Sequence, residues 1–341
     1  MSAPIRVLMV TSAWPSAGQP RTTHFIKRQA EFLQAAGVAL DVFHFRAARR
    51  PQNYAAAWWQ LQRRIAQGGY DVLHAQFGQS GLLAIPKRLP LVVTFRGSDL
   101  LGIVGRGERY TAAGKLLQRL SRWVARRADA VIVVSPHMQS FLPPDVRAHV
   151  VPSGLDLQLF RLIPQDEARR HLGLPPDKKL VLFAANPEWP RKRYALAQQA
   201  MQLLPAAHRA ELVVPWGAPY SDMPYYMNAC DALLFTSMQE GSPNVVKEAL
   251  ACNLPVVSVA VGDVRARLAG VRGCALCADE QPETIARALA GALARPERVA
   301  GREAVGDLDE RRLAQRVIAI YRSVLRPARI GPRVPEASHG W

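Results

Sequence analysis

Long apolar runs and cysteines are both scarce in this chain of 341 residues. No run of about 18 apolar residues occurs, so we expect no transmembrane helix, and residues 5–10 read as a buried strand rather than as part of a signal peptide. The four cysteines lie in the second half, and the lone C-x-x-C at residues 274–277 has neither a second pair nor a nearby histidine. We therefore expect free thiols, no metal site and a cytoplasmic chain.

Acidic residues are also few compared with basic ones. The 27 Asp and Glu residues face 44 Lys and Arg residues, which gives a formal net charge of +17. This balance favours anionic partners such as nucleic acid, an anionic membrane or a phosphorylated substrate. The chain lacks aromatic and basic interleaving, zinc-ligand spacing and a helix-turn-helix pattern, so we expect no specific nucleic acid and keep a basic nucleic-acid-binding protein only as a distant alternative.

Short apolar strands alternate with helices along the chain. Strand patterns occur at residues 5–10, 38–43, 70–74, 91–95, 130–134 and 148–152, and they restart at 180–185, 211–214, 232–236, 255–259 and 274–276. This alternation is typical of parallel sheets covered by helices, whose ligands bind beyond the carboxyl ends of the strands. We predict two similar α/β domains, residues 1–163 and 164–325, followed by a loose tail at 326–341.

The most informative stretch runs through residues 236–258 and reads as strand, tight turn, helix and strand. The Gly-Ser-Pro-Asn cluster ends the first strand, and a helical pattern follows until residue 252. Glu240 would lie in the loop, whereas Glu248 would lie about one turn inside the helix. Because the start of a helix exposes free amides, the segment predicts an anion site with two acids that have different roles.

This segment resembles the signature of the family 4 retaining glycosyltransferases. In that signature an acid, a glycine and small turn residues precede a second acid after seven intervening residues, and Glu240 and Glu248 meet the spacing. Further landmarks of the family occur in order at residues 70–74, 94–99, 133–135, 151–156, 190–192 and 262–267. The resemblance implies the GT-B fold, in which two Rossmann-like domains face each other across a cleft. It also implies that a terminal helix, here 308–325, crosses back to the first domain.

The resemblance further implies a retaining hexosyltransferase that needs no cofactor or metal. It would move a sugar from a nucleoside-diphosphate sugar to a glycan or lipid-linked acceptor during surface polysaccharide or glycoconjugate synthesis. Glu240 would face the donor sugar, and Glu248 would bind the ribose hydroxyls. An enzyme of the same fold that epimerises or hydrolyses a sugar nucleotide is the alternative.

Without a metal, the leaving diphosphate needs fixed cations and amides. Lys192 follows the first strand of the second domain, where the family places a phosphate-binding lysine. An arginine that the family has near position 187 is absent, and either Arg191 or Arg193 would stand in for it. The remaining donor-binding candidates, in the turn, at the helix start and in the loop after the first strand, are Gly241, Ser242, Pro243, Asn244, Val245 and Gly18. Trp216 is a candidate neighbour of the nucleobase, with a buried core position as its alternative.

The acceptor side departs from the family pattern. His74 ends a strand that we expect to point into the cleft, and it is a catalytic candidate with a structural role as the equal alternative. Gln76 and Arg96 stand where the family often has histidines, and neither can act as a neutral imidazole base. A front-side mechanism, in which the leaving phosphate takes the acceptor's proton, therefore fits better. Arg96 and Asp99 would shape the acceptor or phosphate side, or else form an ion pair at a strand end.

A basic stripe marks the helix predicted around residues 115–126. Lys115, Arg119, Arg122 and Arg126 recur at intervals of four, three and four residues, so they share one side of the helix beside an apolar stripe that contains Leu116 and Trp123. On an anionic membrane surface this helix would bring the cleft to a lipid-linked acceptor at the inner face of the cell membrane. Alternatively, the apolar stripe packs on the sheet and the basic stripe is only solvated.

Overall fold

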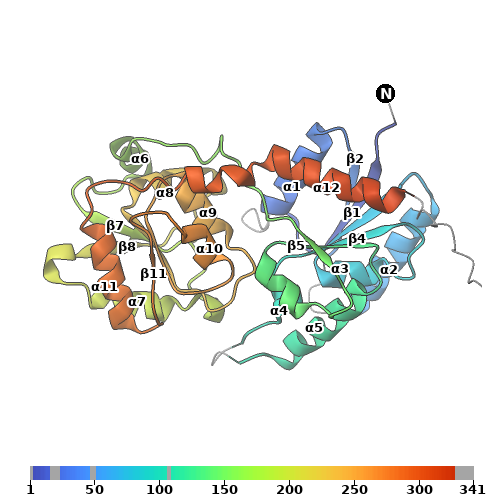
Figure 1. Ribbon diagram of the computed structural model, residues 1–341, viewed down its shortest axis with the longest axis horizontal. Helices are drawn as coiled ribbons and strands as arrows, with labels where there is room; N and C mark the ends of the chain where they lie inside the picture. Colours follow the sequence, from blue (N-terminus) through green and yellow to red (C-terminus); the bar gives the residue numbers. More distant parts are fainter. Residues whose placement is uncertain (1–2, 16–23, 47–50, 106–108, 327–341) are drawn as a thin grey trace, which may run out of the picture.

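The computed structural model describes residues 3–15, 24–46, 51–105 and 109–326, and Figure 1 shows two units side by side. Each unit is built on a parallel sheet. The first sheet has the order β2-β1-β3-β4-β5-β6, with β1 (Arg6–Thr11), β2 (Ala39–His44), β3 (Val72–Gln76), β4 (Leu91–Phe95), β5 (Ala130–Val133) and β6 (Ala148–Val150). The second has the order β11-β10-β9-β7-β8, with β7 (Lys179–Leu182), β8 (Ala210–Val213), β9 (Ala232–Phe235), β10 (Val256–Ser258) and β11 (Ala275–Leu276).

Helices connect the strands and cover the sheets. The first unit contains α1 (His24–Ala35), α2 (Pro51–Ala66), α3 (Gly78–Leu83), α4 (Ser98–Leu101) and α5 (Ala112–Ala125). The rest of the chain contains α6 (Gln165–Leu172), α7 (Tyr194–Gln202), α8 (Met223–Ala229), α9 (Asn244–Ala251), α10 (Val264–Leu268), α11 (Pro282–Leu293) and α12 (Glu310–Leu325). Short 3-10 helices are η2 (Pro136–Phe141), η3 (Pro190–Lys192), η4 (Ala206–His208), η5 (Tyr220–Asp222) and η6 (Glu303–Leu308). Within the described residues, every helix is too short or too polar to span a bilayer.

Every predicted strand is present, with small shifts at the ends, so the predicted α/β fold with two Rossmann-like domains is confirmed. The strands were recognisable because their apolar runs are buried, as parallel strands covered by helices require. The segment between β5 and β6 forms only the 3-10 helix η2, which begins at Pro136 and is followed closely by Pro143. The predicted boundary at residues 163/164 falls immediately before α6.

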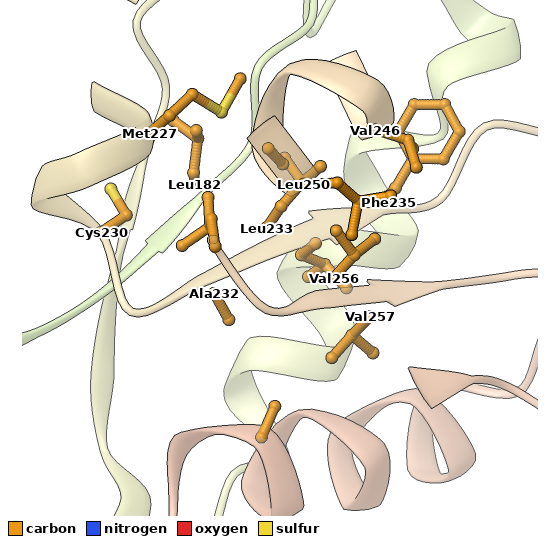
Figure 2. Close-up of a cluster of buried hydrophobic side chains, with 14 of the residues drawn as sticks. Leu182, Met227, Cys230, Ala232, Leu233, Phe235, Val246, Leu250, Val256 and Val257 are labelled. Carbon is orange, nitrogen blue, oxygen red and sulfur yellow. The ribbon is translucent and has the colours of Figure 1, made fainter. Parts of the chain in front are cut away.

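An apolar core anchors the segment from β9 to α9. Figure 2 shows Val246 and Leu250 of α9 on the face of the sheet that also carries Leu233 and Phe235 of β9, whereas Val257 of β10 points to the opposite face. All five side chains are at most 4% exposed. Because this core fixes both the strand and the helix, the turn between them has little freedom to move.

The last helix, α12, returns to the first domain. Asp309 caps its start by accepting hydrogen bonds from the amides of Arg311 and Arg312, and the helix then lies along α1 (Figure 1). Near its end, the fully buried Tyr321 places its hydroxyl 2.6 Å from Nδ1 of His74 on β3. The terminal helix is therefore part of the core of the first domain.

A buried lysine lies where the domains meet. Lys247 of α9 is 1% exposed, and its Nζ donates a hydrogen bond to the carbonyl oxygen of Ser153 at 3.1 Å. Burial lowers the pKa of Lys247 from its ordinary 10.5 to about 8, although the Asp263 carboxylate partly offsets this effect. The charged form of Lys247 therefore opposes folding at neutral pH.

We predict that alkaline pH stabilises the wild-type chain relative to Lys247→Met. Below about pH 8 the lysine is protonated in both the folded and the unfolded chain, so its burial cost is fully present. Between pH 8 and 10.5 the folded chain releases the proton while the unfolded chain keeps it, so the free energy of unfolding rises with pH, by at most about 3 kcal/mol. Urea unfolding of both proteins at about pH 7, 9 and 10 measures this change. A constant difference between the two proteins would contradict the prediction.

Candidate functional site

A cleft between the two domains contains a cavity of about 450 Å³. Its walls are segments that follow the carboxyl ends of strands: those after β1, β3, β4 and β6 in the first domain, and those after β7, β8 and β9 in the second. Ligands of open parallel sheets bind at this edge. Most of the predicted donor-site residues lie here, although Gly18 lies outside the described residues.

The turn from Glu240 to Pro243 touches the first domain. Ser135 Oγ donates a hydrogen bond to the carbonyl oxygen of Gly241 at 2.7 Å. A Cβ atom on Gly241 would lie 2.5 Å from the backbone carbonyl oxygen of Arg96, a separation that packed atoms do not tolerate. Glycine at this position therefore allows the two domains to approach each other at the cleft.

Two cations from η3 hold Glu240. Its Oε1 accepts hydrogen bonds from Lys192 Nζ at 2.5 Å and from Arg191 Nη1 at 2.6 Å. Burial alone would raise the pKa of Glu240, but the charges of Lys192 and Arg191 outweigh burial and lower this pKa below its ordinary value. Glu240 is therefore ionised beside both of the cations predicted to bind phosphate.

The side chains of the basic residues 191–193 lie at two different sites. Arg193 has a left-handed backbone with φ at 50°, and its guanidinium pairs with Glu280 and donates to the carbonyl oxygen of Thr236. Arg191 and Lys192 instead line the cleft. Of the two arginines left open by the sequence, Arg191 is the one whose side chain lies with Lys192 at Glu240.

The start of α9 borders the same cleft. Pro243 precedes the helix without a capping side chain, so the first amides of the helix stay available to a ligand. Asn244 Oδ1 is buried and has no hydrogen-bond partner among the described residues, and Val245 also lines the cleft. The hydroxyl of Ser242 is turned toward Asp263, to which it donates a hydrogen bond at 2.8 Å.

Glu248 lies one turn inside α9 and borders both the cleft and an adjoining cavity of about 150 Å³. Its Oε1 accepts a hydrogen bond from the Tyr220 hydroxyl at 2.7 Å, and that hydroxyl accepts one from Arg28 Nη1 at 2.7 Å. Burial raises the pKa of Glu248 above its ordinary value, and Arg28 and Tyr220 partly offset this rise. Tyr220 and Arg28 were missed in the sequence because no local motif marks a contact between distant segments.

Two tryptophans stand on the second-domain side of the cleft. Trp189 and Trp216 are 42% and 46% exposed, and their ring centroids lie 6.1 Å apart. The alternative of a buried core position for Trp216 is therefore wrong. Trp216 lines both cavities, and in the smaller one it accompanies Val245 and Glu248.

Arg96 lies on the opposite wall with its guanidinium held by neutral groups. All three of its nitrogens donate hydrogen bonds of 2.8 to 2.9 Å, to Gln76 Oε1, Ser153 Oγ and Gln29 Oε1. Burial lowers the pKa of Arg96 to about 10, although Glu310 partly offsets this effect. Arg96 therefore keeps its positive charge at neutral pH.

Asp99 supports the backbone of this wall. Its carboxylate accepts hydrogen bonds from the amide nitrogens of Arg96, Gly97 and Gly78. The alternative of an Arg96–Asp99 ion pair is wrong, because Asp99 binds the backbone of residue 96 and not its side chain.

His74 is buried beneath the cleft and does not line it. It is 0% exposed, and its ring nitrogens lie 2.6 Å from the Tyr321 hydroxyl and 2.7 Å from Thr94 Oγ1. Burial lowers its pKa to about 3, and the charge of Arg96 adds to this effect, so His74 is neutral. The expectation that His74 points into the cleft is wrong, because Tyr321 returns from the end of the chain to cover it. Its catalytic role stays a prediction.

Metal ligands do not gather at this site. Across the part of the chain that the structure describes, no group of three or more His, Cys, Asp or Glu side chains is placed to hold a metal ion. The charged groups of the cleft are instead Arg191, Lys192, Glu240, Glu248 and Arg96.

Two family models match the two halves of the chain. The model for Glycosyltransferase Family 4 matches residues 4–159, and the model for Glycosyl transferases group 1 matches residues 176–295. Among known proteins, the chain is 26% identical to the putative teichuronic acid biosynthesis glycosyltransferase TuaC of Bacillus subtilis (strain 168). That alignment covers 76% of this chain and 82% of TuaC.

Solved structures share the fold. Sucrose-phosphate synthase from Thermosynechococcus elongatus superposes with a TM-score of 0.77 at 19% identity, covering 94% of this chain and 99% of that one. Anabaena HepE, solved in complex with UDP and glucose, gives a TM-score of 0.68 at 17% identity, covering 94% and 100%. These likenesses confirm the GT-B fold. The family matches to the two halves show that this chain belongs to the glycosyltransferases, with a Glycosyltransferase Family 4 first half and a Glycosyl transferases group 1 second half.

Proposed function

We propose that this chain is a retaining, metal-independent hexosyltransferase that moves a sugar from a nucleoside-diphosphate sugar to a glycan or lipid-linked acceptor. One observation supports this most directly. The ionised Glu240 contacts Arg191 and Lys192 in the cleft that also contains the uncapped start of α9 and Glu248. The cleft thus combines a carboxylate for the donor sugar with fixed positive groups for the diphosphate.

The diphosphate gains negative charge as its bond to the sugar breaks. Lys192 Nζ, the Arg191 guanidinium and the first amides of α9 are the groups that would stabilise this charge. Lys192 is only 9% exposed, and a charge shielded from water stabilises a neighbouring anion more strongly than a solvated one does. These groups would do what a divalent cation does in metal-dependent transferases.

Glu240 would bind a donor hydroxyl and stabilise the positive charge that develops at the anomeric carbon. In the proposed front-side route, the acceptor oxygen bonds to that carbon on the face that the diphosphate leaves, and the departing phosphate takes the acceptor's proton. The burial of His74 supports this route, because the imidazole predicted as a catalytic candidate does not reach the cleft.

Glu240→Gln and Lys192→Ala should each abolish transfer and leave the fold intact, because each removes a charge beside the reacting centre. We expect kcat to fall by at least about a hundredfold. The measurement follows labelled glycosidic product in the presence of EDTA, with circular dichroism as the check on folding. Lys178→Ala is the matched control, since this half-exposed lysine pairs with Glu211 on the surface of the same domain.

Three outcomes would contradict parts of this proposal. Wild-type turnover in either variant would refute the site assignment, and loss of wild-type activity in EDTA would refute metal independence. Free or epimerised sugar nucleotide as the sole product would instead favour a GT-B epimerase or hydrolase.

The comparison proteins indicate which substrates to test first. HepE was solved with UDP and glucose, so UDP-glucose is the first donor for a thermal-shift panel. TuaC is named for teichuronic acid biosynthesis, which supports a role of this chain in surface polysaccharide or glycoconjugate synthesis.

The proposal includes contact with an anionic membrane through α5. The buried face of this helix consists of small or short residues, Gly114, Ser121, Val124 and Ala125. Leu116 and Trp123 are 56% and 38% exposed, so the alternative in which the apolar stripe packs on the sheet is wrong for these two residues. An apolar surface is thus available beside the basic stripe.

Basic residues surround this apolar surface. The side chains of Lys115, Arg119, Arg122 and Arg126 are all exposed. Helix α2, like α5, packs against α3 (Figure 1). It exposes Trp59 at 57%, with the Arg63 guanidinium 5.5 Å from the centre of the Trp59 ring. Exposed aromatic and basic side chains together are typical of surfaces that bind anionic lipid. We propose that this face rests on the inner side of the cell membrane and presents the cleft to a lipid-linked acceptor.

Charge reversal on α5 should release the protein from anionic vesicles, because about 1 kcal/mol of attraction is lost for each basic residue removed. The variant replaces three arginines by Glu, namely Arg119, Arg122 and Arg126. The control replaces three exposed arginines of α12, which lies on the other side of the first domain in Figure 1: Arg311, Arg312 and Arg322. Flotation with vesicles of phosphatidylcholine and phosphatidylglycerol measures the bound fraction. Equal binding of the α5 variant and the wild type would reject the membrane face.

A further inference from the structure

We infer that Tyr220 is a positioning residue for the donor ribose. It orients Glu248 only while helix α1 of the first domain contacts it. Tyr220 lies in η5, on the loop that follows β8, and borders both cavities of the cleft. The inference rests on the proposed role of Glu248 in binding the ribose hydroxyls. Beyond that role, Tyr220 would orient the Glu248 carboxylate, and this orientation would depend on contacts from the first domain.

Two hydrogen bonds in series link Arg28, Tyr220 and Glu248. Arg28 Nη1 donates to the Tyr220 hydroxyl at 2.7 Å, and the same hydroxyl donates its single proton to Glu248 Oε1 at 2.7 Å. Each bond has a charged partner, and bonds in series polarise one another. Burial also raises the pKa of Tyr220 well above its ordinary value, so the hydroxyl keeps the proton that it donates.

The Tyr220 ring packs against two other rings. The His24 ring stacks on it with centroids 4.3 Å apart and planes 7° apart, and the Phe160 ring lies at 72° to it with centroids 5.9 Å apart. His24 and Arg28 are four residues apart on α1, so they lie on one side of that helix. Helix α1 therefore contacts both the ring and the hydroxyl of Tyr220, although it belongs to the other domain.

Arg28 is itself firmly placed. It is 8% exposed, its Nε lies 3.4 Å from Glu310 Oε1 of α12, and its Nη2 donates to the carbonyl oxygen of Gly154 at 3.3 Å. A side chain at Gly154 would collide with Glu310, since a Cβ atom there would lie 2.4 Å from its carboxylate. Movement of α1 away from the second domain would therefore remove two supports from Tyr220 at once, the stacked ring and the guanidinium.

The hydrogen bond from Tyr220 leaves one oxygen of the Glu248 carboxylate, Oε2, for a ligand. The Tyr220 hydroxyl binds Oε1, while Oε2 accepts no hydrogen bond from the residues that the structure describes, and Glu248 faces the cleft. A carboxylate can accept two neighbouring hydroxyls at once only if its plane is fixed. Tyr220 fixes that plane, so the preference for a ribose with both hydroxyls should depend on Tyr220.

The test compares the binding of UDP and 2′-deoxy-UDP by calorimetry, with GDP and 2′-deoxy-GDP used instead if the wild-type chain binds GDP more tightly. Wild type is expected to prefer the ribonucleotide about tenfold. Tyr220→Phe should weaken the ribonucleotide about tenfold and leave the deoxynucleotide nearly unchanged, so the preference disappears. Tyr226→Phe is the matched control, because Tyr226 packs in the core of the same domain, and it should behave as wild type.

Arg28→Lys is the second variant. It keeps the positive charge but loses the geometry that reaches the Tyr220 hydroxyl and Gly154 together, so the ribose preference should fall by several-fold. Thermal unfolding of each variant shows whether it is folded. A variant that is merely loosened would bind both nucleotides more weakly by the same factor, so the ratio of the two affinities separates positioning from instability.

The outcomes distinguish this inference from the function on which it rests. If Tyr220→Phe keeps the wild-type ribose preference while Glu248→Gln loses it, Glu248 binds the ribose without help from Tyr220 and the inference is overturned. Equal weakening of both nucleotides by Tyr220→Phe also overturns it. If Glu248→Gln itself keeps the preference, the proposed ribose role of Glu248 fails and the inference fails with it.

Discussion

The cleft depends on the pairing of Glu240 with Lys192 and Arg191. A carboxylate buried alone would bind a proton, and a lysine buried alone would lose one. Here the Glu240 carboxylate stands within hydrogen-bonding distance of both cations, so it favours the charged form of Lys192, while the two cations favour the ionised form of Glu240. Removing Glu240 would leave two neighbouring cations without their shared counter-charge, which costs more than losing a surface ion pair. The end of β9 and the helix η3 are therefore held together by the same charges that would meet a sugar diphosphate.

Packing brings these charges to the cleft. Val246 and Leu250 fix α9 on the second sheet, and Gly241 lets the turn pass against the backbone of Arg96. The domains also meet through the hydrogen bond from Lys247 to Ser153 and through the stacked rings of His24 and Tyr220. Relative motion of two such domains would let the cleft admit a donor and release a nucleotide.

Local patterns in the sequence predict which segments are buried and where the chain turns. They do not predict which distant segments come into contact. The alternation of apolar runs and the spacing of Glu240 and Glu248 predicted the two sheets and the strand-turn-helix segment. His74 was expected in the cleft and is buried instead, because nothing in the sequence near residue 74 indicates that Tyr321 will pack against it. In α5 the two stripes were visible, but only the structure shows that the small residue Gly114 faces inward, where an added Cβ would lie 2.4 Å from the amide nitrogen of Ile103.

The two acids of the segment also differ in a way that their spacing could not reveal. Glu240 touches two cations directly, so its pKa is lowered, whereas Glu248 meets a neutral hydroxyl with Arg28 behind it, so burial dominates and its pKa is raised. On acidification Glu248 therefore takes up a proton before Glu240 does. If Glu248 binds the ribose and Glu240 faces the sugar, acidification would first weaken binding of the nucleotide. The negative charge of Glu240, which stabilises the reacting sugar, would persist to lower pH. The different properties of the two acids are thus set by their partners, which are Lys192 and Arg191 for Glu240 and Tyr220 for Glu248.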